Sequence, residues 1–247
     1  MEETSPAVLL IADISGFTRF MRLHALTNSH ARQIIVRLLK ALVDTSGTPL
    51  KVAELEGDAV FFYALSTEDG LKKDVDAVKE QILRFFRIFK REIEALQQVT
   101  ACVCEACTTV GELRLKQVVH YGEVAVEKID RFEKLFGLDV IVVHRMLKNT
   151  VPSNEYLMMT APAYAACKGF YDLEPEQRTE EFDGVGAVET VVFYDTSLAS
   201  ALEHMPADPP RLRKNIGWKL KMHGRTLLEL AGLRKKEDDP LSFPGLP

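Results

Sequence analysis

Two short acidic segments of this sequence together predict a site for a divalent metal ion. Asp13 ends an apolar run and is followed by Ser-Gly-Phe-Thr, and Asp58 ends the run Glu-Leu-Glu-Gly-Asp, in which the glycine permits a tight turn. An ionised carboxylate at the end of a buried strand is costly unless a cation or hydrogen-bond donors face it. Mg²⁺ prefers hard oxygen ligands and keeps substrate phosphates in its shell. Either aspartate alone would more often cap a turn, whereas the pair favours a metal.

The turn after Asp13 also carries a phosphate-binding feature. Gly16 and Phe17 open a helix expected over Phe17 to Leu26. The free N–H groups at a helix N-terminus favour anions such as phosphate. One carboxylate beside such a turn is half of a metal–nucleotide site.

Three cysteines within six residues form a second candidate site. Thiolates with the spacing of Cys102, Cys104 and Cys107 can converge on one soft cation such as tetrahedral Zn²⁺. The fourth ligand would be Cys167, His120 or a group from a second subunit. The alternatives are reduced thiols in a surface loop, or a redox switch. Cysteines this crowded cannot pair with one another easily, which favours a cytoplasmic chain with reduced thiols.

The segments that carry the aspartates are expected to be strands of one sheet. Val8 to Ile14 is a short apolar run with β-branched members, closed by a Ser-Gly pair. Leu50 to Leu55 and Ala59 to Leu65 are strand-like and are separated by Glu-Gly-Asp, which is typical of a hairpin. A hairpin beside the first strand would bring Asp58 within metal-bridging distance of Asp13.

The remaining pattern mixes hairpins with helical crossovers. This order fits a ferredoxin-like α/β sandwich (α+β), with a mixed, mostly antiparallel sheet, better than a purely parallel sheet. Phe132 to Gly137 is expected to be a loop or short helical turn, and the cysteine segment a loop. Further helices are expected over Ser29–Val43, Lys72–Leu96, Val140–Lys148 and Pro162–Lys168. Further strands are expected over Leu113–Val126 (broken at Tyr121-Gly122), Tyr156–Thr160 and Glu181–Tyr194 (two halves separated by Gly184 and Gly186).

Composition and charge exclude several classes of protein. A formal net charge of −5 argues against a general nucleic-acid binder, which needs a basic face. No uncharged apolar run approaches the ~20 residues of a membrane-spanning helix, and the first apolar stretch does not have the pattern of a signal peptide. The composition shifts after Thr196, which predicts one domain over residues 1–196. Residues 197–247 are expected to form a linker, a basic helix over Arg211 to Leu233 and a flexible tail.

Four segments of the chain, in order, resemble the catalytic domain of class III adenylate and guanylate cyclases. Ala12 to Thr18 resembles their first metal motif and Glu54 to Asp58 their second. Val119 to Val124 resembles their strand ending in His-x-Gly, and Phe136 to Arg145 their transition-state helix. The similarity spans about Val8 to Tyr194. It is greatest to a poorly characterised bacterial branch that shares the Cys-x-Cys-x-x-Cys segment and the His-Arg-x-Leu-Lys-Asn run.

The resemblance implies a role for individual residues. Asp13, Ile14 and Asp58 would hold Mg²⁺ or Mn²⁺, and Arg145 would stabilise the triphosphate in the transition state. Glu54 and Lys134 fall at the two base-selecting positions. A glutamate at the first is similar to guanylate cyclases, because a carboxylate accepts from the N–H groups of guanine. The nucleotide site would also include Gly16 and Phe17.

The resemblance also implies a homodimer that binds a nucleoside triphosphate, because the aspartates and the arginine of one site come from opposite subunits. The implied reaction is metal-dependent conversion of GTP or ATP to a cyclic nucleotide and pyrophosphate. The alternative is a catalytically degenerate module that binds nucleotide, metal or a protein partner. Three departures favour that alternative: Ile141 replaces the ribose-orienting asparagine, Asp183 the triphosphate-binding lysine, and Lys134 fits neither usual pattern. Asn149, one helical turn beyond Arg145, is the one nearby amide that could replace the missing asparagine.

Overall fold

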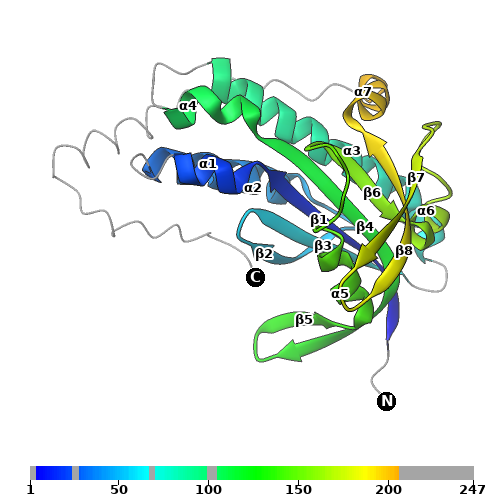
Figure 1. Cartoon of the computed structure of the whole chain (residues 1–247). Coiled ribbons are helices and arrows are strands. Elements are labelled where there is room, and N and C mark those ends of the chain that lie inside the picture. Colours follow the sequence, from blue (N-terminus) through cyan, green and yellow to red (C-terminus); the bar gives the residue numbers. More distant parts are fainter. Residues whose placement is uncertain (1–3, 24–27, 67–69, 99–104, 206–247) are drawn as a thin grey trace.

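The computed structural model describes residues 4–23, 28–66, 70–98 and 105–205. Over these ranges the chain forms the predicted α/β sandwich, with helices on both faces of a mixed, mostly antiparallel sheet (Figure 1). Its strands are β1 (Ser5–Ser15), β2 (Lys51–Glu56), β3 (Ala59–Leu65), β4 (Arg114–Ile129), β5 (Phe132–Phe136), β6 (Tyr156–Thr160), β7 (Glu176–Phe182) and β8 (Gly186–Tyr194). Its helices are α1 (Phe17–Leu23), α2 (Asn28–Thr45), α3 (Gly70–Gln98), α4 (Glu105–Thr109), the 3₁₀ turn η1 (Val110–Glu112), α5 (Leu138–Arg145), α6 (Ala161–Ala166) and α7 (Asp195–Glu203).

The strand order places the first acidic segment, on β1, inside the sheet and next to the hairpin that carries the second. The order is β2-β3-β1-β4-β6-β8-β7, and β5 pairs with the far end of β4. The β4–β6 pair is parallel and the other pairs are antiparallel. β1 therefore lies between the β2–β3 hairpin and β4, with a neighbour on each side.

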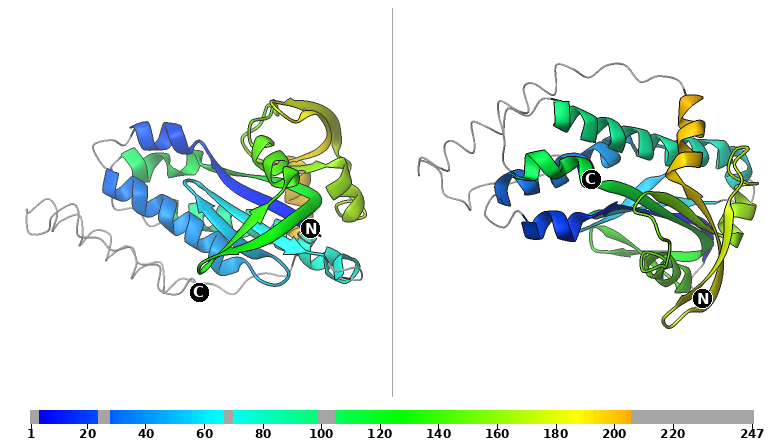
Figure 2. Two further views of the ribbon diagram at one scale, coloured as in Figure 1. Left: turned by 90° about the horizontal axis from the view of Figure 1, so that it is seen from below. Right: turned by 45° about the horizontal axis from the view of Figure 1, so that its top comes forward.

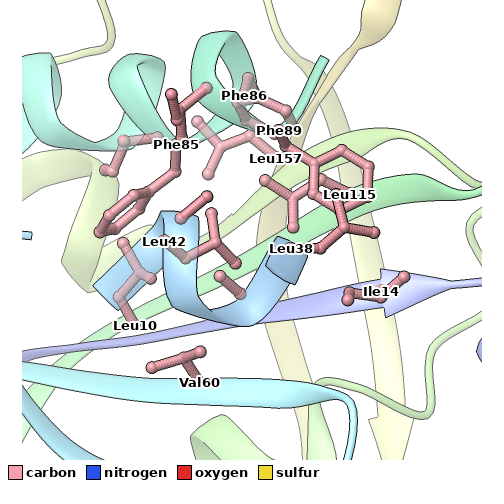
Figure 3. Close-up of a cluster of buried hydrophobic side chains, with 14 of the residues drawn as sticks. Leu10, Ile14, Leu38, Leu42, Val60, Phe85, Phe86, Phe89, Leu115 and Leu157 are labelled. Atoms are coloured by element: carbon pink, nitrogen blue, oxygen red, sulfur yellow. The ribbon is translucent and has the colours of Figure 1, made fainter. Parts of the chain in front are cut away.

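Alternation along β1 builds two hydrophobic cores, because successive side chains of a strand point to opposite faces. Leu10 and Ile14 face the core beneath α2 and α3, whereas Leu9 and Ile11 face the core beneath α5. Figure 3 shows Leu38 and Leu42 of α2 between β1 and the phenylalanines of α3. Figure 2 shows α2 and α3 on one face of the sheet and α5 on the other. Asp13 continues the odd-numbered series, so it lies on the face that α5 covers.

Three predictions of local structure are wrong. The cysteine segment, expected to be a loop, enters helix α4 at Glu105, so Cys107 is helical. The segment expected to be a loop or helical turn is strand β5, which pairs with Ala125–Ile129 of β4. The strand expected to break at Tyr121-Gly122 continues through this pair as the 16-residue β4. The two strands form a hairpin arm that extends beyond the main sheet (Figure 1).

The C-terminal prediction is only partly within the described residues. Helix α7 crosses the expected boundary at residue 196 and buries Leu198 in the core beneath α3. The linker, basic helix and tail lie mainly in residues 206–247, outside the described ranges, so the division of the chain stays a prediction. Among the described helices, none is long and apolar enough to span a membrane.

Candidate metal and nucleotide site

The fold brings Asp13 and Asp58 together at the end of β1. In the β1–β3 register Asp13 pairs with Ala59, so Asp58 lies in the turn directly beside it. The Ile14 amide donates to the Asp58 carbonyl oxygen at 3.2 Å, which fixes the turn against β1. The two carboxyl groups lie within hydrogen-bonding reach of each other. Ile14 buries its side chain in the opposite core, so only its main chain borders this cluster.

The close approach of two carboxylates has an electrostatic cost. Burial first, and then the charge of Asp13, raise the pKa of Asp58 from 3.8 to about 6. A divalent cation between the carboxylates would remove this repulsion, and their hard oxygen atoms suit Mg²⁺ or Mn²⁺. The donor set therefore fits the metal that the sequence predicts.

Lys116 joins the carboxylate cluster, and the sequence reasoning missed it. It is the register partner of Asp13 across the β1–β4 pair, and its Nζ lies 2.8 Å from Asp13 Oδ2. Nζ also donates to the carbonyl oxygen of Leu147 at 3.4 Å, just beyond the end of α5. The strand sequences alone do not give this register. The signal that could have found Lys116 is its place four residues before His120, on the same face of the strand expected over Leu113–Val126.

The raised pKa of Asp58 makes the stability of the fold depend on pH. The folded state binds this proton more tightly than the unfolded chain, so stability falls as pH rises from about 4 to about 6 and stays lower above that. We expect Asp58→Asn to stabilise the protein at pH above 6 and to be neutral below pH 4. The pKa shift sets an upper bound of about 3 kcal/mol on this gain in the free energy of unfolding. Solvent screening at the half-buried side chain reduces the expected gain to about 1 kcal/mol.

Urea denaturation of both proteins across this pH range, without divalent metal, measures the effect. A gain for Asp58→Asn that is equal at acidic and neutral pH would contradict it, because an effect on packing does not follow the titration of a carboxyl group.

The side chain of Asn149 does not replace the missing ribose amide. Its amide nitrogen donates to the Met146 carbonyl at 2.6 Å and to the Tyr156 hydroxyl at 2.7 Å, and its Oδ1 accepts from the Val151 amide. These internal hydrogen bonds use the side-chain amide of Asn149. It therefore does not compensate for Ile141, whose side chain is exposed on α5.

The two base-selecting positions lie against each other. Lys134 on β5 donates to Glu54 on β2 in an ion pair between half-exposed side chains. Each side chain therefore neutralises the charge of the other. A purine that bound here would have to form hydrogen bonds to the paired side chains or break the ion pair between them.

Arg145 ends α5 and is partly exposed. Its guanidinium lies 3.7 Å from the carboxylate of Asp183, the residue at the predicted triphosphate-lysine position. The preceding residue, His144, donates from Nε2 to the Glu56 carboxylate at 2.8 Å and packs edge-on against Phe61. This contact anchors α5 beside the turn that holds Asp58.

His120 is engaged at both ring nitrogens. Nδ1 contacts the Thr160 hydroxyl at 2.9 Å and Nε2 contacts Asp139 at 2.8 Å. Asp139 also accepts from the Glu123 amide at 2.7 Å, so it fastens α5 to β4. A Cβ on Gly122 would overlap the Asp139 carboxyl group. His120 is thus structural, and its nitrogens are not available as the fourth zinc ligand.

The turn after Asp13 has the predicted geometry at its glycine. Gly16 adopts a φ of +88°, which favours glycine, and α1 begins at Phe17. The Phe17 side chain packs against the core beneath α2 and α3. The phosphate contact of these two residues stays a prediction.

The cysteine site also stays a prediction. Cys102 and Cys104 lie outside the described residues. Cys107 is buried in α4, with Sγ 3.8 Å from His30 Nδ1. Burial raises the pKa of Cys167 to about 11, which disfavours the thiolate that a metal needs. Within the described ranges, no three His, Cys, Asp or Glu side chains gather as a metal site.

Comparison with known protein sequences finds relatives without an assigned activity. Residues 35–156 match the model of a family described as "Protein of unknown function (DUF2652)". The chain is 34% identical over 156 residues to "Uncharacterized protein Rv2561/Rv2562" of Mycobacterium tuberculosis. The match covers 63% of this chain and 71% of that protein.

Comparison with solved structures finds cyclases. The adenylyl cyclase CyaB from P. aeruginosa aligns with a TM-score of 0.56 and 15% identity over 79% of this chain and 96% of that one. The guanylyl cyclase Cya2 aligns with a TM-score of 0.54 and 16% identity, over 77% of this chain and 92% of that one. A class III adenylyl cyclase-like ATP-binding protein from Pseudomonas aeruginosa aligns with a TM-score of 0.53 and 22% identity, over 66% of this chain and 35% of that one. Similarity at these identities establishes a shared fold, which confirms the predicted fold class.

Proposed function

The chain belongs to the family of the mycobacterial protein Rv2561/Rv2562 and has the class III cyclase fold, and on this basis we propose that it is a metal-dependent nucleotidyl cyclase. The substrate would be GTP or ATP, and the products a 3′,5′-cyclic nucleotide and pyrophosphate. The meeting of Asp13 and Asp58 in one partly buried cluster carries the proposal, because a divalent cation bound between the two carboxylates would relieve the repulsion that raises the pKa of Asp58.

Asp13 and Asp58 would hold Mg²⁺ or Mn²⁺ through their carboxylate oxygens. When bound, the metal supplies the charge that holds the attacking and leaving oxygens in line. The ribose 3′ oxygen would bond to the α-phosphorus as the bond to the pyrophosphate oxygen breaks. Arg145 would donate to the triphosphate oxygens as their charge grows.

The ion pair between Glu54 and Lys134 bears on the choice of base. Guanine offers N–H donors to a carboxylate and an adjacent carbonyl oxygen to an ammonium group. Both side chains could therefore contact guanine without losing all of their mutual attraction. This arrangement supports GTP as the preferred substrate.

We further propose that the protein is a homodimer. Five large apolar side chains are exposed on the hairpin arm, which carries Lys134, and on α5, which carries Arg145. Burying such a patch against a second copy would remove apolar surface from water and would complete each site from two subunits. These side chains are those of Ile129, Phe132, Phe136, Leu138 and Ile141.

A specific observation favours a second candidate, a nucleotide-binding module without turnover. Ile141 exposes an apolar side chain where a ribose-orienting amide is expected, and Asp183 pairs with Arg145 where a lysine is expected. Losing oriented donors weakens transition-state binding more than ground-state binding.

One experiment separates the two candidates. Purified protein is incubated with GTP or ATP and Mn²⁺, and the cyclic product is quantified. We expect a product that Asp58→Ala lowers by about 100-fold or more, since that variant removes half of the metal site. Asp172→Ala, an exposed carboxylate in the turn after α6, is the matched control. If no product forms but GTP and Mn²⁺ raise the melting temperature, the binding module replaces the cyclase.

A further inference from the structure

Lys116 supplies a cation to the carboxylate cluster from within the chain. Its ammonium group lies 2.8 Å from Asp13 Oδ2, and the side chains of Lys116 and Asp13 are only 19% and 13% exposed. The pair is therefore largely removed from solvent and is not an ordinary surface salt bridge, in which screening leaves little attraction.

One further contact holds the ammonium group in place. The Leu147 carbonyl, just past the C-terminus of α5, accepts from Nζ at 3.4 Å. The carbonyl groups at a helix C-terminus favour positive charge. On the neighbouring strand β6, the register partner of Lys116 is Tyr156, whose hydroxyl is already bonded to Asn149. The lysine thus sits between a carboxylate and a helix end, at the position where a divalent ion would have to approach Asp13.

We infer that Lys116 is a built-in counter-cation that competes with the divalent metal for Asp13 and so sets the metal affinity of the site. An Mg²⁺ or Mn²⁺ ion needs a carboxylate oxygen at about 2.1 Å. The ammonium group already takes one lone pair of Asp13 Oδ2, and it repels a second positive charge placed this close. Metal binding at Asp13 is therefore weaker while Lys116 stays beside it. This inference rests on the metal site of the proposed function.

Calorimetric titration with Mn²⁺ at neutral pH tests the competition without any turnover. We expect Lys116→Met, which keeps the apolar stem and removes the charge, to bind Mn²⁺ at least about tenfold more tightly than the wild type. Lys116→Arg keeps the charge and should stay within about threefold of the wild type. Lys128→Met, an exposed lysine on the arm of the same strand, is the control for general charge effects.

Thermal melting gives a second readout. Without metal, Lys116→Met leaves two carboxylates with no counter-ion, so its melting temperature should fall below that of the wild type. Mn²⁺ should then raise the melting temperature of Lys116→Met more than that of the wild type.

The outcomes separate this inference from the function on which it rests. Equal Mn²⁺ affinity in the wild type and Lys116→Met, abolished in both by Asp58→Ala, overturns the competition and leaves the metal site standing. Absence of Mn²⁺ binding from both proteins overturns the metal site and the competition together.

Discussion

Mixing Asp58→Ala protein with Arg145→Ala protein is expected to restore about a quarter of the wild-type cyclase activity, although each variant alone loses about 100-fold or more. This expectation rests on the resemblance to class III cyclases, which implies that the two aspartates and the arginine of one site come from opposite subunits. Random exchange makes half of the dimers mixed. In each mixed dimer one site carries both substitutions and the other carries neither.

The measurement is cyclic product formed after the two proteins have exchanged subunits, compared with each protein alone. A mixture of Asp13→Ala and Asp58→Ala is the matched control. Both substitutions fall on the carboxylate side, so every site in a mixed dimer keeps one defect and activity should stay low. Recovery in the control as well, or none in the first mixture, would rule out sites shared between subunits.

Replacing Gly122 by alanine is expected to destabilise the fold by about 3 kcal/mol or more. The added Cβ would overlap the Asp139 carboxyl group, which cannot simply turn aside. It accepts from the Glu123 amide at 2.7 Å and contacts His120 at 2.8 Å, and displacing it would leave the buried ring nitrogen of His120 without its partner. The change would also loosen α5, which carries Arg145.

Urea denaturation measures the effect. Gly47→Ala is a suitable control, because its added Cβ would meet no atom within 4 Å, and its stability should change by less than about 0.5 kcal/mol. Adding Gly122→Ala to an Asp139→Ala background should cost little, since the overlapping group is then gone. A full additional loss in that background would show that Asp139 is not the cause.

The carboxylate pair could be predicted from the sequence because both aspartates follow local signals. An apolar β-branched run predicts β1, and Glu-Gly-Asp between two strand-like segments predicts the β2–β3 hairpin. Both elements are confirmed, and their pairing places Asp58 beside Asp13.

Lys116 could not be placed in the same way. Its contact with Asp13 depends on the register between two strands that are about 100 residues apart, which no local pattern specifies. The ion pair of Glu54 with Lys134 depends on a second such approach, between β2 and the arm.

The arm itself could not be predicted for a different reason. Four of the five residues of β5 are exposed, so the segment lacks the alternation of buried and exposed side chains that predicts a strand. Its strand conformation comes from pairing with β4, a tertiary contact that outweighs the local pattern.

Strand β4 runs without interruption from Arg114 to Ile129, and this continuity has a mechanical consequence. Lys116 lies near its start, the contacts of His120 with Asp139 lie midway, and the apolar arm forms its far end. The arm and the lysine belong to one strand, so a partner whose binding displaced this strand at the arm would also move the lysine. Binding of a partner to the arm and binding of the metal ion to the carboxylates would then be thermodynamically linked. Each would change the affinity of the other by the same factor.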